Sequence, residues 1–240
     1  MLLQGDMHTH TIASTHAYST IMENAVCAKK AGLKGFAMTD HAMNMPDSPH
    51  SWHFENLHIL PRKIADVTVL KGAEANIIDA DGNLDMDDYL LNMMEWIVAS
   101  MHGDTFASRD PQTTTKAYLN AVKNRSIDVI GHPTTTRFLC DYEVCVKAFK
   151  EYEKLVEINE SSLNAGRSKR ENVVKMMKLC KKYEVPVVID TDCHFCELIG
   201  KTPLVSQLVE ELDFPQKLIM NTDWDKIREF VLKKRPTLDI

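Results

Sequence analysis

Seven short apolar segments recur along the chain at nearly constant spacing, and each ends in a polar residue. The segments are LLQGDMH, LKGFAMTDH, VTVLKGAEAN, WIVASMH, IDVIGH, KLVEIN and VPVVIDTDCH, and their polar ends are His8, His41, Glu74, His102, His132, Asn159 and Asp192. Successive ends lie 33, 33, 28, 30, 27 and 33 residues apart. A strand with its returning helix takes about 30 residues. The spacing therefore predicts seven parallel strand-and-helix units.

Helical patterns occupy the stretches between several of these segments. The clearest begins at Thr20, whose hydroxyl forms a capping box with Glu23, and ends at Gly32 after an amphipathic run. Further helices are expected at residues 112–124, 141–154, 169–183 and 223–234. Strands and helices that alternate in this way predict an α/β fold with a parallel sheet.

Residues suited to metal binding end nearly every predicted strand, which restricts the shape of the sheet. Six of the seven ends are His, Glu or Asp, and an α/β barrel gathers all its strand ends on the face that carries the active site. An open, doubly wound sheet brings together only the few strands at its switch point. We therefore predict a seven-stranded (β/α) barrel in a single domain over residues 1–240, since no linker or composition break divides the chain.

Composition and charge narrow the class of protein. No apolar stretch approaches the roughly 20 residues of a membrane span, and no basic and apolar leader indicates secretion, so a soluble, cytoplasmic protein without a membrane partner is expected. The net charge of −6 disfavours a nucleic-acid partner, because binding a phosphate backbone relies on clustered Lys and Arg. Six scattered cysteines predict free thiols. Nothing in the sequence indicates the oligomeric state.

Nine side chains form the candidate metal-binding set. Two pairs stand two residues apart, His8 with His10 and Asp192 with His194, and a period of two places each pair on one side of its strand, with Cys193 on the other side. The full set is His8, His10, His16, His41, Glu74, His102, His132, Asp192 and His194. Because a catalytic zinc takes about three protein ligands, nine donors predict two or three ions. Imidazole and carboxylate donors suit zinc, manganese or iron.

Other residues are candidates for supporting roles. Asp6 and Asp40 each lie close to a candidate histidine in the sequence, and we expect them to accept hydrogen bonds that orient imidazole rings. Arg167 and Lys169 follow the sixth predicted strand and are candidates to hold a phosphate of the substrate. His53, within SPHSWHFENLHILPRK, is a candidate to shape the substrate pocket.

Taken together, these motifs resemble the PHP family, which is named for the polymerase and histidinol phosphatase domains. The resemblance rests on DMHTH, TDH, GAEAN, SMHG, GHP and DTDCH, and it covers essentially the whole chain. ASTHAYST and PHSWHF are most similar to the stand-alone, YcdX-like phosphatase branch. The resemblance implies a distorted, TIM-like (β/α)7 barrel of the PHP fold. It also implies three metal ions, usually zinc and alternatively manganese or iron.

The resemblance further implies how the nine donors divide among the ions. The first ion would be held by His8, His10, Glu74 and Asp192, the second by Glu74 as a bridge with His102 and His132, and the third by His16, His41 and His194. The loops HGDTFASRD and HPTTTRF, which follow two of these histidines, look particular to this chain. The resemblance therefore does not identify the substrate.

A multinuclear site of this kind indicates hydrolysis of phosphate esters. Neighbouring ions would activate a water as hydroxide, hold the phosphoryl oxygens and neutralise charge in the transition state. We predict a phosphatase that acts on small phosphomonoesters. Asp40 and His53 are candidate acids for the leaving group, although the sequence identifies neither as catalytic.

Two alternative functions remain open. A 3′–5′ exonuclease or phosphodiesterase would need a groove with basic or stacking residues to hold a nucleic-acid strand. A non-catalytic, metal-stabilised interaction domain would tolerate lost ligands, whereas all nine positions are filled in this sequence.

Overall fold

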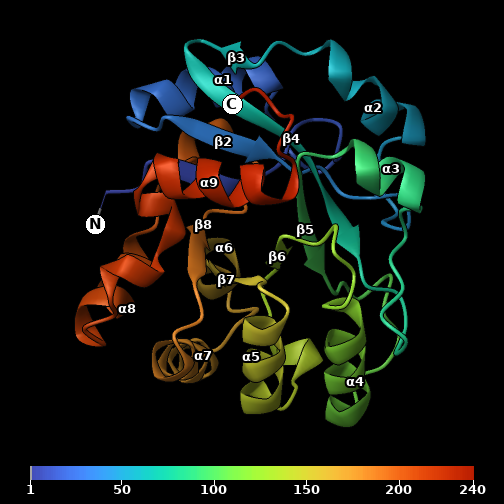
Figure 1. The fold of residues 1–240 in the computed structure, drawn as a ribbon, viewed down its shortest axis with the longest axis vertical. Coiled ribbons are helices and arrows are strands. Elements are labelled where there is room, and N and C mark those ends of the chain that lie inside the picture. Colours follow the sequence, from blue (N-terminus) through green and yellow to red (C-terminus); the bar gives the residue numbers. More distant parts are fainter. Residues whose placement is uncertain (1) are drawn as a thin grey trace.

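A parallel sheet with the strand order β1-β2-β4-β5-β6-β7-β8 forms the centre of the computed structural model, which describes residues 2–240. The strands are β1 (Gly5–Thr9), β2 (Gly35–Met38), β4 (Val67–Asn76), β5 (Trp96–Ser100), β6 (Val129–Ile130), β7 (Leu155–Asn159) and β8 (Val187–Asp190). A bridge between Thr9 and Cys193 brings the β1 end of the sheet beside the chain that follows β8. The sheet thus curls into a nearly closed barrel (Figure 1), which confirms the predicted architecture.

The sequence pattern did not reveal one short strand. β3 (Lys63–Ile64) pairs antiparallel with the start of β4 and lies outside the order of the parallel strands. Two residues are too few to show the alternation of polar and apolar side chains from which strands are recognised.

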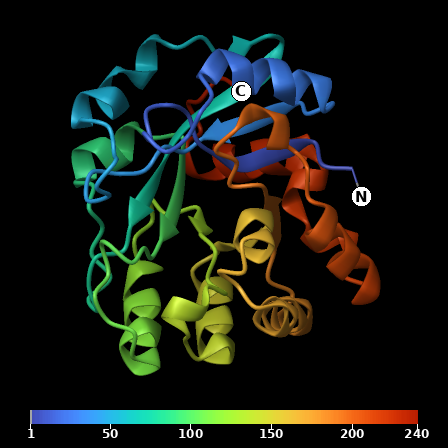
Figure 2. The same ribbon diagram turned by 180° about the vertical axis from the view of Figure 1, so that it is seen from behind.

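The α-helices within residues 2–240 include all five that the sequence predicts. They are α1 (Ile21–Lys30), α2 (Ser51–Glu55), α3 (Asp88–Met93), α4 (Pro111–Ala121), α5 (Tyr142–Glu151), α6 (Glu160–Asn164), α7 (Arg170–Tyr183), α8 (Pro203–Glu211) and α9 (Trp224–Lys234). The predicted helices correspond to α1, α4, α5, α7 and α9. In both views α4, α5 and α7 lie side by side along the lower edge of the molecule (Figures 1 and 2). Short 3-10 helices cover Asn56–Ile59, Thr136–Phe138, Cys196–Leu198, Gln216–Leu218 and Met220–Thr222.

The start of α1 has the predicted capping box. The Glu23 amide donates to Oγ1 of Thr20 at 3.3 Å, and the Thr20 amide donates to Oε2 of Glu23 at 2.7 Å. Two backbone N–H groups at the helix start are satisfied in this way. The helix ends just before Gly32, whose φ of 79° lies in the left-handed region that favours glycine.

Apolar side chains fill the barrel at the amino-terminal ends of its strands. The buried group consists of Met7, Ala37, Leu70, Trp96, Val98, Val129, Leu155 and Val188, packed against Trp224, Ile227 and Val231 of α9. In Figure 1, α9 is red and runs across the middle of the view, in front of the sheet. A side-chain carbon at Gly35 would lie 2.1 Å from the Trp224 ring, so the helix contacts the sheet backbone directly. With this end of the barrel filled, the opposite end is left for polar residues.

No helix within residues 2–240 combines the length and the apolar character needed to cross a membrane. All six cysteines are free, as predicted.

Candidate metal centre

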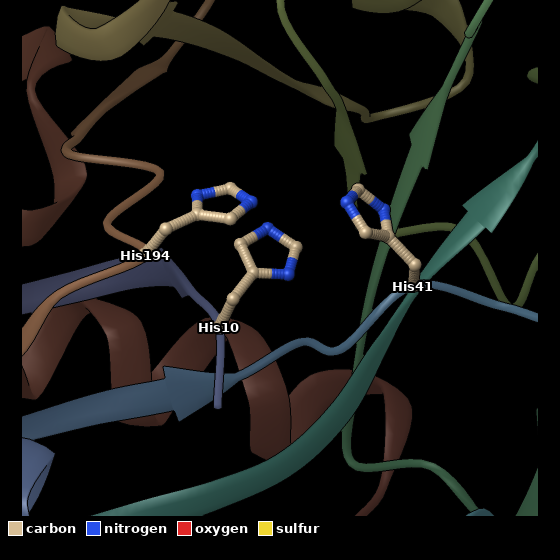
Figure 3. Close-up of side chains that lie close together, drawn as sticks. All are labelled: His10, His41 and His194. Atoms are coloured by element: carbon tan, nitrogen blue, oxygen red, sulfur yellow. The ribbon is translucent and has the colours of Figure 1, made fainter. Parts of the chain in front are cut away.

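The carboxyl-terminal ends of the strands bring all nine candidate donors into one region. Donor atoms lie within 4.8 Å of one another in three overlapping groups, which are His10 with His41 and His194, His8 with His10 and Glu74, and His41 with Glu74 and His102. Figure 3 shows the first group, with His41 facing His10 and His194 across a shared space. These three histidines follow β1, β2 and β8, so the curvature of the sheet brings them together.

Glu74 lies between two sets of imidazoles. Its Oε2 is 2.7 Å from Nδ1 of His41, 3.4 Å from Nε2 of His8 and 3.6 Å from Nε2 of His10. Its Oε1 is 3.0 Å from Nε2 of His132 and 3.3 Å from Nε2 of His102. The two oxygens of one buried carboxylate therefore face different groups of histidines.

Asp192 contacts the same histidines from the far side. Its Oδ1 lies 3.1 Å from Nε2 of His10 and 3.7 Å from Nε2 of His8. Its Oδ2 accepts hydrogen bonds from Arg167 at 3.2 Å and from Asn159 at 3.3 Å. Asp192 has a φ of 51°, a left-handed backbone conformation that few residues other than glycine adopt. Backbone strain at a carboxylate that faces several imidazoles is typical of a functional site.

An outer group of imidazoles stacks beside this inner one. The ring centroid of His194 lies 4.3 Å from that of His16 and 4.3 Å from that of His10, while the rings of His16 and His41 are 5.3 Å apart. The His16 side chain is 51% exposed, so this group lies at the solvent side of the centre. Cys193 is buried within the hydrophobic core, in agreement with the predicted alternation.

Three residues that the sequence analysis missed fix the orientation of imidazole rings. Nδ1 of His8 lies 2.7 Å from Oε1 of Glu157, Nδ1 of His102 lies 2.6 Å from Oδ1 of Asn76, and Nδ1 of His16 contacts Oδ2 of Asp47. Each contact leaves Nε2 of the ring free to face the centre, which is how ligand histidines are usually held. Glu157 lies in β7 two residues before the strand end Asn159, and Asn76 lies in β4 two residues after the candidate donor Glu74. A strand has a period of two, so each of them is on the same side as that residue, and the sequence could have revealed both.

Glu157→Gln is expected to lower metal affinity or activity by about 10-fold to 100-fold. Oε1 accepts from His8 while Oε2 accepts from the His132 amide at 2.5 Å, and a glutamine would offer an NH₂ group to one of these two donors. Metal content and kcat/KM measure the effect. Glu160→Gln is the matched control, because Glu160 accepts only from the amides of Leu204 and Val205. Equal losses in the two variants would show that the contact with His8 is unimportant.

The two aspartates expected to orient imidazoles have other partners. Asp6 accepts from the amide and hydroxyl of Thr191 and from the Gly200 amide. Asp40 accepts from Thr11 and Ser14, and its Oδ2 lies 3.4 Å from Nε2 of His53. The prediction was wrong for Asp6, which accepts no hydrogen bond from an imidazole of residues 2–240, whereas Asp40 does face the imidazole of His53. Both carboxylates tie together the loops that follow the strands.

The chemistry of these residues fits bound transition metals. Nε2 of His194 is buried and has no hydrogen-bond partner within residues 2–240, and Nδ1 of His41 and Oε2 of Glu74 are buried 2.7 Å apart in a geometry that makes no hydrogen bond. A buried polar atom without a partner costs free energy unless something else binds it. Three such atoms among converging imidazoles and carboxylates form a donor set suited to zinc, manganese or iron.

Electrostatics at the centre also favour cation binding. Burial and the neighbouring imidazole of His41 lower the pKa of His10 to about 3, which leaves this ring neutral. Burial opposes ionisation of Glu74, yet His8 and His102 hold the pKa of its carboxyl well below its usual value. Neutral imidazole and ionised carboxylate are the forms that bind metal ions, and His10 and Glu74 are in these forms. Burial opposes protonation of His8, yet the neighbouring carboxylates of Glu157 and Glu74 raise the pKa of this ring, so a metal ion bound there would displace a proton.

A cavity of about 290 Å³ adjoins the donors. Its lining includes seven of the nine candidate donors, and it also includes Thr135, Thr136, Arg137, Ser162 and Arg167. Arg167, a predicted substrate-binding residue, therefore faces the cavity, and so does Arg137, which the sequence analysis did not single out. Lys169 and His53 are not among the lining residues, and their substrate-binding role stays a prediction.

Comparison with known proteins matches most of the chain to the family that its sequence motifs resemble. A family model described as the PHP domain matches residues 6–165. A probable phosphatase of Caldanaerobacter subterraneus is 40% identical over 232 residues, which cover 96% of this chain and 91% of that protein. A probable phosphatase of Clostridium acetobutylicum is 40% identical over 95% of this chain and 94% of its own length.

Solved structures with the same fold are more distant in sequence. A histidinol phosphate phosphatase of Lactococcus lactis, complexed with zinc, L-histidinol and phosphate, matches with a TM-score of 0.51 and 14% identity over 98% of this chain and 94% of that chain. A Listeria monocytogenes protein, named as a candidate histidinol phosphatase, matches with a TM-score of 0.61 and 17% identity over 82% and 97% of the two chains. At these identities the likeness establishes the fold alone.

Proposed function

Because the chain belongs to the PHP domain family, we propose that it is a metal-dependent phosphatase that hydrolyses small phosphomonoesters. The observation that carries the proposal is the convergence of six imidazole and carboxylate donors in overlapping groups, with His16, His132 and Asp192 in contact with them, beside a cavity that Arg167 also lines. Relatives that are about 40% identical over nearly the whole chain and are named probable phosphatases support the same activity.

We assign the donors to three ions, with zinc as the favoured metal and manganese or iron as alternatives. His8, His10, Glu74 and Asp192 would hold the first ion, Glu74 with His102 and His132 the second, and His16, His41 and His194 the third. The contacts of Glu74 support its role as the bridge, since Oε2 lies near His8 and His10 whereas Oε1 lies near His102 and His132. When bound, such ions supply a nucleophilic hydroxide near neutral pH and neutralise charge on a phosphoryl group.

The protein side chains position the reacting groups. Arg167 is held by Oδ2 of Asp192 and by Oγ of Ser161, with its guanidinium facing the cavity, where it would bind phosphoryl oxygens. Glu157, Asn76 and Asp47 hold the rings of His8, His102 and His16 so that their ligand nitrogens do not need to reorganise during reaction. Asp40 and His53 do not line the cavity, so neither is placed to protonate a leaving group there.

The size of the cavity favours a small substrate over a nucleic-acid strand. About 290 Å³ accommodates a compact ester. Phe138 is the one phenylalanine, tyrosine or tryptophan in its lining, and it is buried to 2% exposure, so it offers little surface on which bases stack. Among residues 2–240, the lining thus lacks the exposed stacking surface expected of an exonuclease groove.

The metal-replete protein is expected to release phosphate from sugar phosphates and from p-nitrophenyl phosphate, and to degrade a single-stranded oligonucleotide slowly or not at all. Parallel assays on one preparation give kcat/KM for each substrate. Asp192→Asn is the control, because it should abolish any cleavage that this site catalyses. Preferential cutting of the oligonucleotide, lost in Asp192→Asn, would contradict the proposal and establish the nuclease alternative.

A further inference from the structure

Two arginines line one wall of the cavity, and backbone contacts hold their loops together. The amide and hydroxyl of Thr136 both donate to the carbonyl oxygen of Arg167 at 2.9 Å. Thr135 and Ser168 form an antiparallel bridge beside this contact. Arg137 directly follows Thr136, so the loop after β6 and the loop after α6 present Arg137 and Arg167 to the same cavity.

The two guanidinium groups differ in their charge partners. Arg167 pairs with Asp192, one of the proposed metal ligands. Arg137 donates to the carbonyl oxygen of Gly103 at 3.0 Å and forms no ion pair with any residue in 2–240. The positive charge of Arg137 at the cavity wall is therefore available to bind an anion, whereas the charge of Arg167 is already paired with Asp192 of the proposed metal centre.

Gly103 leaves the space in which the Arg137 guanidinium sits. A side-chain carbon added at Gly103 would lie 2.5 Å from Cζ of Arg137. The Arg137 guanidinium also lies 5.8 Å from the centre of the Phe138 ring. Packing on a glycine backbone and next to a buried aromatic ring restricts the directions that this long side chain can take.

The remaining charges of the cavity define the substrate that it suits. Glu74 and Asp192 are the carboxylates among its lining residues, and both belong to the proposed metal centre. No other carboxylate of residues 2–240 lines the cavity to bind an amine, and an unpaired guanidinium repels one. A guanidinium binds carboxylate or phosphate through paired hydrogen bonds.

We propose that Arg137 binds a second anionic group of the substrate, so that this enzyme acts on phosphomonoesters that also carry a carboxylate or another phosphate. The inference rests on the proposed phosphatase activity and deepens it. Substrates with an amino group near the ester, of which histidinol phosphate is an example, would be poor. Thr135 and Thr136 provide hydroxyl groups in the lining beside Arg137 that can complete the binding of the second anion.

Matched pairs of esters test the inference. 3-Phosphoglycerate differs from glycerol 3-phosphate by a carboxylate, and glucose 1,6-bisphosphate differs from glucose 6-phosphate by a phosphate, so the two pairs distinguish the two kinds of anion. Wild-type protein is expected to have the higher kcat/KM for the more anionic member of at least one pair. Arg137→Ala should lower that value about tenfold, mainly through KM, and change the value for glycerol 3-phosphate less than about twofold.

Two further variants separate recognition from general effects of charge and folding. Arg137→Lys keeps the charge but not the paired geometry and should fall between wild type and Arg137→Ala. Arg125→Ala removes the same charge from an exposed residue that precedes β6, at the opposite end of the strands, and should leave the preference unchanged. An equal loss on both members of each pair in Arg137→Ala would overturn the inference, because Arg137 would then act on the reacting phosphoryl group or on the fold.

Binding measurements keep the inference separate from the phosphatase proposal. If the wild type hydrolyses none of the esters, the proposed function fails, and calorimetric Kd values for the same pairs decide the role of Arg137. Tighter binding of the more anionic member, lost in Arg137→Ala, would support the subsite. The same Kd for both members would overturn it.

Discussion

Glu74→Gln is expected to lower kcat/KM for phosphomonoesters by about a hundredfold or more, the largest loss from any single substitution considered. The carboxylate faces five imidazoles through its two oxygens, so its amide replacement removes a charge and turns one oxygen into an NH₂ group. A group that only orients a ligand costs about 10-fold to 100-fold when it is changed. Removing a shared ligand costs more, because metal is lost along with activity.

Cys193→Ala is the control for Glu74→Gln. Cys193 is buried in the hydrophobic core next to the candidate ligands Asp192 and His194, and its side chain does not belong to the donor groups. The variant should lose some stability through the small cavity that it creates and should keep its bound metal. Metal content, thermal melting and kcat/KM measured on both variants make the comparison. Equal loss of activity would contradict the assignment of Glu74 to the centre.

Removing the metal is expected to abolish phosphatase activity and to lower Tm. A chelator would leave buried imidazoles and carboxylates without the cations that balance them, and unpartnered atoms such as Nε2 of His194 would destabilise the folded chain. Activity should return as metal is added back, with more than one equivalent per chain needed for full recovery. The return of melting temperature on the same samples gives a readout that is independent of catalysis.

The metal stoichiometry provides the critical measurement for this prediction. Elemental analysis of protein purified without added metal should give more than one transition-metal ion per chain. At most one ion after full replenishment would rule out the three-ion assignment. Asp192→Asn, measured alongside, should lower the content, because Oδ1 of Asp192 lies among His8, His10 and His194.

The strand ends were predictable because the sequence records them in two ways. An apolar run marks each strand, and a His, Glu or Asp marks six of the seven points where the chain leaves the barrel. Both signals are local. The spacing predicted seven parallel strands, and the residue types at the strand ends predicted a barrel that brings together residues as distant as His8 and Asp192. The helices α2, α3 and α6 have five or six residues each and were missed, because so few residues cannot show helical periodicity. The nine-residue α8 was missed as well, and shortness does not explain that miss.

Contacts between loops were harder to anticipate. Asp6 and Asp40 stand next to histidines in sequence, yet their carboxylates bind Thr191, Gly200, Thr11 and Ser14. Asp47, which does contact an imidazole, lies 31 residues from His16. Arg137 belongs to the cavity because the Thr136 amide reaches the carbonyl of Arg167, a pairing between loops that no periodic pattern encodes. The donors of the site were thus predicted from the strands, whereas their hydrogen-bond partners depend on loop geometry.

Because α9 follows every strand in the sequence, the ribosome makes the helix that covers the barrel after it has made the barrel strands. Trp224, Ile227 and Val231 fill the amino-terminal end of the barrel, and they are synthesised after every strand. At about 5–20 residues per second, the ribosome needs a few seconds to travel from Asp192 to α9. During that interval every proposed metal ligand has been made, while Met7, Trp96 and Leu155 still lack the helix that covers them. We expect the nascent chain to depend on chaperones most strongly in this interval.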